Sequence, residues 1–184
     1  MKKLIISVLG QDRPGIIAAV SDVLYRQQYN IEDVSQTILQ SSFSSIFIVT
    51  GPDSSDPQAL GQVLNDETRN MNMHYYVREL DDKQPKWTQS ACESFVITTR
   101  GPDQKGLVAK VAKVLADNNV NVTQLQAVFR GGDEPDRNVM IYEVDIPVDV
   151  DFNKLRQALK DTGHALNLEI SIQHKDVFEA VNRI

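Results

Sequence analysis

Apolar residues recur along the chain with two different spacings, that of a strand and that of a helix. The same succession of spacings occurs twice. Short β-rich runs at 4–7 and 95–98 each precede a polar loop that contains glycine. After each loop, four apolar residues recur at i, i+4, i+7 and i+8, which places them on one face of an amphipathic helix. These residues are Ile16, Val20, Val23 and Leu24 in the first copy and Leu107, Val111, Val114 and Leu115, 91 positions later, in the second. The pattern predicts a strand followed by a helix at the start of each copy.

The later part of each copy also repeats, at an offset four residues larger, because the second copy has a longer hairpin around 131–135. Asp56 and Asp151 each stand where an N-cap would begin a second helix. Farther on, apolar and polar residues alternate at 71–77 and at 166–172, as in a strand with one buried face. Each copy therefore predicts the order β-α-β-β-α-β, and we interpret the chain as a duplicated domain.

This order of elements predicts an α+β fold of the ferredoxin-like type in each copy. Both helices should cover one face of a four-stranded antiparallel sheet. The right-handed crossover rule places the first and third strands at the centre and the second and fourth at the edges. The other face of the sheet is left bare, so we expect pairing between copies or between chains.

The repeat also sets the expected domain boundaries, which are 1–80 for the first domain, 81–92 for a linker, 93–175 for the second domain and 176–184 for a tail. The linker is charged, contains a proline and lacks periodicity, as exposed connections do. Its Trp87 is interpreted as a residue that pins the linker to a domain, with contact to a partner chain as the alternative. In the tail, the spacing of Val177, Val181 and Ile184 predicts a short helix suited to docking or dimerisation.

Composition excludes several classes of partner. The formal net charge is -6 and no run of Lys and Arg is present, which disfavours direct binding of DNA or RNA. No apolar stretch approaches the roughly twenty residues needed to cross a bilayer, so no membrane association is expected. The amino terminus begins a strand and lacks the apolar core of a signal peptide. Cys92 is the single cysteine, so no internal disulfide can form, which favours a reducing cytoplasm.

The residue pattern gives little support to catalysis. His74, His164 and His174 are scattered without a pair at metal-ligand spacing, and Cys92 has no nearby histidine. Glycine patterns that bind nucleotides are missing. Other proteins of this topology are also disfavoured, because an RNA-recognition module needs exposed aromatics and a metal carrier needs a Cys-x-x-Cys pair. We therefore expect a protein that is not an enzyme, with no catalytic residue, no metal and no cofactor.

The repeated loop is the strongest candidate for function. It joins a strand end to a helix N-terminus, where the first amides lack intrahelical partners and the helix dipole is positive. Gly15 and Gly106 lack a Cβ, so a small ligand could approach the backbone. Asp12 and Asp103 are placed either to cap the helix or to accept a hydrogen bond from an ammonium group. These groups would complement a free amino acid, although the same residues also make an ordinary turn and helix start.

Two stretches of the chain begin at the repeated loop. The first, at 10–21, reads Gly-Gln-Asp-Arg-Pro-Gly-Ile-Ile-Ala-Ala-Val-Ser, and the second, at 101–112, reads Gly-Pro-Asp-Gln-Lys-Gly-Leu-Val-Ala-Lys-Val-Ala. Both resemble the first loop and helix of ACT domains. The resemblance covers about 3–80 and 93–175, and the tandem arrangement is similar to that of the glycine cleavage system transcriptional repressor family. It implies ligand-sensing modules that pair side by side and bind amino acids near this loop. The implied ligand-binding residues are Asp12, Gly15, Ile16, Asn30 and Ile31 in the first copy and Asp103, Gly106, Leu107, Asn121 and Val122 in the second. The second copy departs from the Asp-Arg-Pro-Gly form at 104–105, so the resemblance does not imply equal binding by both copies.

The sequence therefore favours a non-catalytic regulatory protein that forms a homo-oligomer and senses a small amino acid. The resemblance suggests glycine or serine as the ligand, and another regulatory protein or an enzyme as the controlled partner, including in transcriptional regulation of amino-acid metabolism. Two alternatives remain at this stage. One is a ligand-free structural or assembly module, and the other is a free-standing regulatory subunit of a metabolic enzyme.

Overall fold

The computed structural model describes residues 1–80, 91–128 and 138–182. The chain divides into two compact units, Met1–Gln84 and Pro85–Ile184. Most of the expected linker with Trp87, the hairpin around 131–135, and Ile184 lie outside the described residues. Each unit is therefore described by itself.

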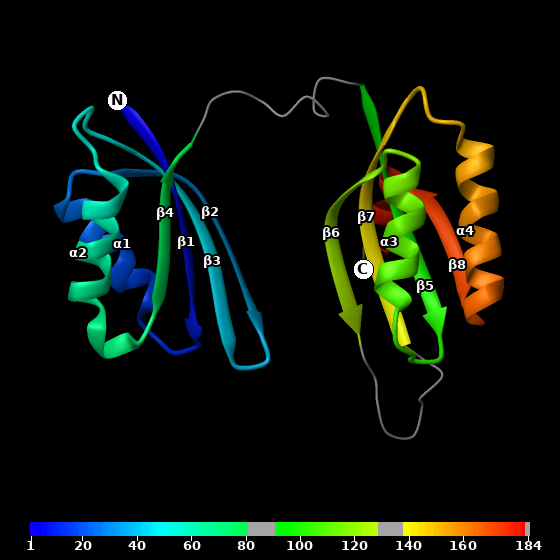
Figure 1. Ribbon diagram of the computed structural model, residues 1–184, viewed down its shortest axis with the longest axis horizontal. Coiled ribbons are helices and arrows are strands. Elements are labelled where there is room, and N and C mark those ends of the chain that lie inside the picture. Colours follow the sequence, from blue (N-terminus) through cyan, green and yellow to red (C-terminus); the bar gives the residue numbers. More distant parts are fainter. Residues whose placement is uncertain (81–90, 129–137, 183–184) are drawn as a thin grey trace. The chain divides into compact units, whose positions relative to one another are not determined.

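Both units follow the predicted order of elements (Figure 1). The first contains β1 (Lys2–Gln11), α1 (Ile16–Arg26), β2 (Asn30–Leu39), β3 (Ser42–Gly51), α2 (Pro57–Glu67), the 3-10 turn η1 (Arg69–Met71) and β4 (His74–Glu79). The second contains β5 (Cys92–Gly101), α3 (Leu107–Asp117), β6 (Asn121–Val128), β7 (Asn138–Pro147), α4 (Phe152–Leu166), β8 (Glu169–His174) and α5 (Lys175–Asn182).

The two sheets have the same topology. The strand orders are β2-β3-β1-β4 and β6-β7-β5-β8, and the paired strands are antiparallel. The first and third strands of each unit are central, as the crossover rule predicts. Figure 1 shows α1 and α2 on one face of the first sheet and α3 and α4 on one face of the second. The predicted α+β, ferredoxin-like fold is confirmed.

Each unit has its own hydrophobic core between helices and sheet. In β1 the alternating Leu4, Ile6 and Val8 are at most 1% exposed and face the helices. In the first helix of each copy, seven of the eight residues predicted to face the core are buried: Ile16, Val20, Val23, Leu24, Leu107, Val111 and Leu115. Burial of these side chains is the main term that holds each sheet to its helices.

The second helix of each unit begins at its predicted cap. Asp56 accepts a hydrogen bond from the Gln58 amide at 3.0 Å, and Asp151 accepts one from the Lys154 amide at 3.0 Å. The predicted strand starts at 71 and 166 are wrong, because Met71 closes a 3-10 turn and Leu166 is the last residue of α4. In both places an asparagine with positive φ, Asn72 or Asn167, ends the helical backbone before the strand begins.

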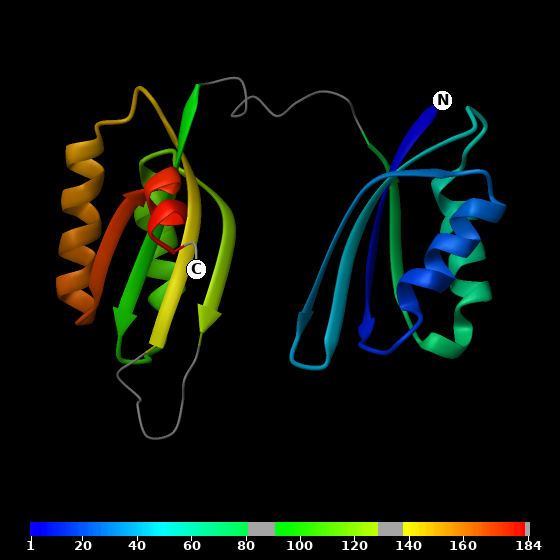
Figure 2. The same cartoon turned by 180° about the vertical axis from the view of Figure 1, so that it is seen from behind.

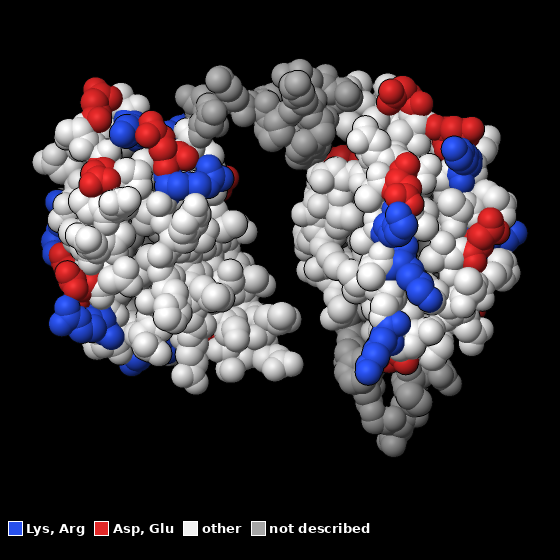
Figure 3. Space-filling view, viewed as in Figure 1, with Lys and Arg blue, Asp and Glu red and all other residues white. Residues whose placement is uncertain are grey.

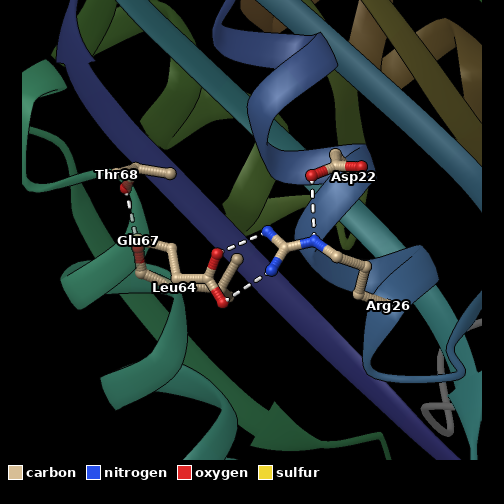
Figure 4. Close-up of polar contacts among 5 residues, drawn as sticks. All are labelled: Asp22, Arg26, Leu64, Glu67 and Thr68. Carbon is tan, nitrogen blue, oxygen red and sulfur yellow. Dashed lines mark hydrogen bonds and ion pairs between the residues drawn. The ribbon is translucent and has the colours of Figure 1, made fainter.

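An ion-pair network joins α1 to α2 in the first unit (Figure 4). The Arg26 guanidinium contacts both Glu67 carboxylate oxygens, and its Nε donates to Asp22 at 3.0 Å. Glu67 first, and then Asp22, raise the pKa of Arg26 above its ordinary value. The second unit has the opposite charge order within α3, where Lys113 pairs with Asp117 at 3.0 Å.

The two sheets differ on the face away from their paired helices. In the second unit, α5 contacts β5 and β8 and lies opposite α3 and α4 (Figures 1 and 2). Lys175 of α5 donates to Glu143 at 2.7 Å, and Val96 on this face is only 3% exposed. In the first unit the same face carries Ile46 and Tyr76, which are 46% and 65% exposed. In the described part of the chain, each helix is too short or too polar to cross a bilayer.

Candidate functional site

The repeated loops leave the N-termini of α1 and α3 without side-chain caps among the described residues. Gly15 and Gly106 precede these helices with φ of 96° and 88°, in the left-handed region where residues other than glycine are strained. Asp12 and Asp103 do not cap the helices and are exposed. The first-turn amides can therefore meet a ligand carboxylate, with a protein carboxylate three residues before each glycine.

A hydrogen bond to a backbone carbonyl in η1 of the first unit, or at the end of α4 in the second, holds each loop in place. Arg13 donates to the Asn70 carbonyl at 3.1 Å, and its counterpart Gln104 donates to the Leu166 carbonyl at 2.6 Å. The Asp12 amide also donates to the Ser41 carbonyl at 2.8 Å, which places this loop against the tip of the β2–β3 hairpin. Although the residue differs between the copies, Arg13 and Gln104 thus each donate a supporting hydrogen bond to a backbone carbonyl.

A second glycine in each loop permits close contact with the chain that enters the last strand. A Cβ added at Gly101 would lie 2.7 Å from the Asn167 carbonyl oxygen, and one added at Gly10 would lie 2.5 Å from the Met73 sulfur. At Gly101 the loop therefore lies directly against the backbone at the end of α4, whereas at Gly10 the Met73 side chain fills the space. The sequence marked these glycines only as the starts of the repeated loops.

The implied ligand-binding residues occupy three different places. Asp12 and Gly15 lie in the exposed loop, whereas the Ile16 side chain is 2% exposed and belongs to the core. Asn30 and Ile31 begin β2, at the opposite end of an eleven-residue helix, which separates them from the loop by about 16 Å along its axis. One unit therefore does not bring all five residues to one small molecule.

The second copy repeats this division. Asp103 and Gly106 lie in the loop, and the Leu107 side chain is 3% exposed in the core. Asn121 and Val122 begin β6 at the far end of α3. A pocket of about 290 Å³ lies beside Asn121, bordered also by Asn119 and Asp145.

The Asn30 end of the first unit also carries paired charges. Lys3 contacts Glu32 at 2.7 Å, and the Thr50 hydroxyl donates to the same carboxylate. The hydrogen bond from Lys3, followed by that from Thr50, lowers the pKa of Glu32 below its ordinary value. This carboxylate therefore stays charged near neutral pH and is already engaged.

A larger cavity adjoins the loop of the second copy. Its volume is about 640 Å³, and its lining includes Arg100, Pro102, His164, Asn167 and Glu169. The size and the mixture of charged and neutral polar groups suit a small polar molecule. In the described part of the chain, no three His, Cys, Asp or Glu side chains are placed to hold a metal ion.

Sequence reasoning missed Asn138, the first residue of β7. This side chain is 6% exposed, and its Nδ2 donates to Asp103 Oδ1 at 3.4 Å. Its Oδ1 is buried without a hydrogen-bond partner among the described residues, and such an unpaired acceptor costs about 1–3 kcal/mol. The register places Asn138 opposite Gly101, as Phe43 is opposite Gly10. Comparing the copies at this position would have revealed a polar residue in place of a core aromatic.

The surface charge around these elements is mixed. On the face in Figure 3, Lys and Arg lie among Asp and Glu in both units. Neither unit therefore presents a broad field of one sign on that face. The loop places uncapped first-turn amides beside a carboxylate, an arrangement that a zwitterion would match.

Comparison with solved structures supports the fold. A crystal structure of an unknown protein from Galdieria sulphuraria has a TM-score of 0.76 and 20% identity, and the match covers 94% of this chain and 98% of that one. A candidate glycine cleavage system transcriptional repressor has a TM-score of 0.69 and 16% identity, and its match covers 94% and 96%. At these identities the likeness concerns the fold alone.

Sequence relatives match half of this chain. A UPF0237 protein of Methanococcus maripaludis is 37% identical over 93 residues, which are 50% of this chain and 99% of the relative. A UPF0237 protein of Methanopyrus kandleri is 36% identical over 91 residues, covering 48% and 96%. The ACT domain family matches twice, at 2–77 and 93–173. The chain belongs to the ACT domain family, whose members are regulatory domains that bind small ligands.

Proposed function

We propose that this protein is a non-catalytic regulator that binds a small amino acid at the loops before α1 and α3 and thereby controls a partner protein. The observation that carries the proposal is the pair of uncapped helix N-termini at Gly15 and Gly106, each preceded by an exposed carboxylate. The helices α2 and α4, by contrast, have their first amides capped by aspartate. Unlike α2 and α4, the loop-side helices α1 and α3 thus keep their first-turn amides for a ligand.

The geometry of the loop favours a small ligand with two opposite charges. Its carboxylate would accept from the first-turn amides, and its ammonium group would donate to Asp12 or Asp103. In the described structure, nothing lies within 4 Å of a Cβ placed at Gly106, so a ligand has room beside the backbone there. Glycine and serine are the proposed ligands because they are small enough for such an approach.

Pairing of two chains through their edge strands would complete the site. The loop lies at the hairpin end of β2, while Asn30 and Ile31 lie at its beginning. Antiparallel pairing of two β2 strands would therefore bring the Asn30 end of one chain to the loop of the other. A homo-oligomer of this kind would place Asp12 and Gly15 of one chain near Asn30 and Ile31 of the other, around one ligand.

The partner is proposed to be another protein. The chain is acidic overall and carries both signs of charge on the face in Figure 3, which supports an indirect role in transcription over direct contact with nucleic acid. We propose further that this partner acts in amino-acid metabolism in the cytoplasm. Coupling between ligand and partner of about 1–3 kcal/mol would change partner affinity roughly five- to 150-fold.

Thermal unfolding with each amino acid in turn tests the proposal. A ligand at 100 times its dissociation constant adds about 2.7 kcal/mol to stability, so one or two amino acids should raise the melting temperature clearly. Titration calorimetry would then give the stoichiometry per chain. A panel without any stabilising amino acid, and without heat of binding, would contradict the proposal.

The second candidate function is a ligand-free assembly module. It is favoured by the edge strands, because β6 has no charged residue and β2 has none after Asp33. Uncharged edges are suited to pairing with another strand. If self-association were strong and the amino-acid panel were flat, this candidate would replace the first.

A further inference from the structure

One acceptor atom at the loop of the second copy has no hydrogen-bond partner within the described structure. Asn138 Oδ1 is buried and unpaired, while the Nδ2 of the same amide donates to Asp103. The neighbouring carboxylate fixes this orientation, because the reversed amide would place an oxygen against an oxygen. The loop therefore offers a free acceptor directly beside a carboxylate.

The first copy has no equivalent of this acceptor. Phe43 occupies the matching position, is 2% exposed and belongs to the first hydrophobic core. Asp12, which corresponds to Asp103, thus has an aromatic ring where Asp103 has an amide. The two loops share their backbone form and their support by Arg13 or Gln104, and they differ in polarity beneath the carboxylate.

The unpaired Asn138 Oδ1 and the Asp103 carboxylate beside it indicate the charge of the group that they would bind. A carboxylate and an amide oxygen are both acceptors only, so together they match a cation with several N–H donors. The Asn138–Asp103 hydrogen bond is 3.4 Å long, beyond the usual 2.7–3.2 Å, so a small shift of the exposed loop can open it. An ammonium group entering there would satisfy Oδ1 and Asp103 at once.

We infer that amino-acid binding is tightest at the second copy, where Asp103 and Asn138 Oδ1 receive the ligand ammonium group and the N-terminus of α3 receives its carboxylate. This inference rests on the proposed function. It adds which copy binds the ligand more tightly, and it names Asn138 as the residue responsible. The first copy, with Asp12 alone, binds the same ligand weakly.

Titration calorimetry and thermal unfolding of the full chain with glycine and with serine test this assignment. The Asn138→Leu variant should melt at a higher temperature without ligand, because the unpaired oxygen is gone. Its affinity for the amino acid should fall by roughly 10- to 100-fold, the worth of a hydrogen bond to a charged group. Asp103→Ala should lose binding to a similar extent, and because this residue is exposed it tests the site even if Asn138→Leu folds poorly.

Two comparisons make the outcome decisive. The matched change Asp12→Ala should leave the tighter binding event in place, and N-acetylglycine, which lacks the ammonium group, should bind wild type and Asn138→Leu equally poorly. Wild-type affinity in Asn138→Leu would mean that water satisfies the amide oxygen, and the inference would be overturned. Loss of the tighter event in Asp12→Ala would also overturn it, by moving the site to the first copy. Failure of wild type to bind any amino acid would instead remove the proposed function itself.

Discussion

Each loop contains two glycines that serve different physical purposes. Gly15 and Gly106 adopt positive φ, so their requirement is conformational. Gly10 and Gly101 have no positive φ, and their requirement is space, because other atoms occupy the position of a Cβ. The loop geometry is therefore fixed by backbone conformation at one end and by packing at the other.

The space requirement differs between the copies and can be measured by alanine substitution. At Gly101 the obstructing atom is the backbone carbonyl of Asn167, which cannot move without distorting the end of α4. At Gly10 the nearest atoms belong to the flexible Met73 side chain. Gly101→Ala should cost roughly 3 kcal/mol and Gly10→Ala about 1 kcal/mol, within the range for overpacked sites. Urea unfolding of the two variants would check the order, and equal losses would contradict the argument.

At the scale of helices and strands, the sequence predicted the structure correctly wherever the spacing of apolar residues directly reflects which side chains are buried. The 3.6-residue period located α1 and α3, and the crossover rule ordered the strands. Period alone failed at Met71 and Leu166, because the left-handed Asn72 and Asn167 place the helix ends later than alternation suggests. Asn138 escaped notice because its role depends on Asp103, 35 residues away, and on burial that no local pattern reports.

The capped and uncapped helices make a matched pair for mutation. Asp56→Ala removes the acceptor for the Gln58 amide and should destabilise the first unit by about 1 kcal/mol. Asp12→Ala removes no cap and should change stability by less than about 0.5 kcal/mol. Chemical denaturation of both variants without ligand would test this difference. A larger loss in Asp12→Ala would show that its carboxylate supports the loop after all.

The β2 edge is the element on which the proposed pairing of chains depends. Ile38 on this strand is 50% exposed, and Ile38→Lys would place a charge at the shared edge. Self-association should weaken by about tenfold or more, since burying an unpaired ammonium costs well over about 1.4 kcal/mol. Tyr25→Lys on α1, where the side chain is 77% exposed, is the control. Analytical ultracentrifugation that detects equal association in both variants would exclude this edge.

At the scale of the whole molecule, duplication has been followed by divergence of the two units. Matching positions keep their place in the fold and change their chemistry, as Phe43 and Asn138 do. The charge order in the first helices is likewise reversed between Asp22–Arg26 and Lys113–Asp117. Such a chain is better suited to unequal tasks in its two units than to two copies of one task.

The short helix α5 has a consequence for how many neighbours the protein can hold. A chain with two identical adhesive sheet faces could join others at both, and repeated joining of that sort produces open-ended polymers. Because α5 lies over this face of the second sheet, less of its area is open to a neighbour than on the same face of the first sheet, as far as the described residues show. If chains associate through sheet faces, growth should then stop at a closed pair, with the C-terminal helix as the element that ends it.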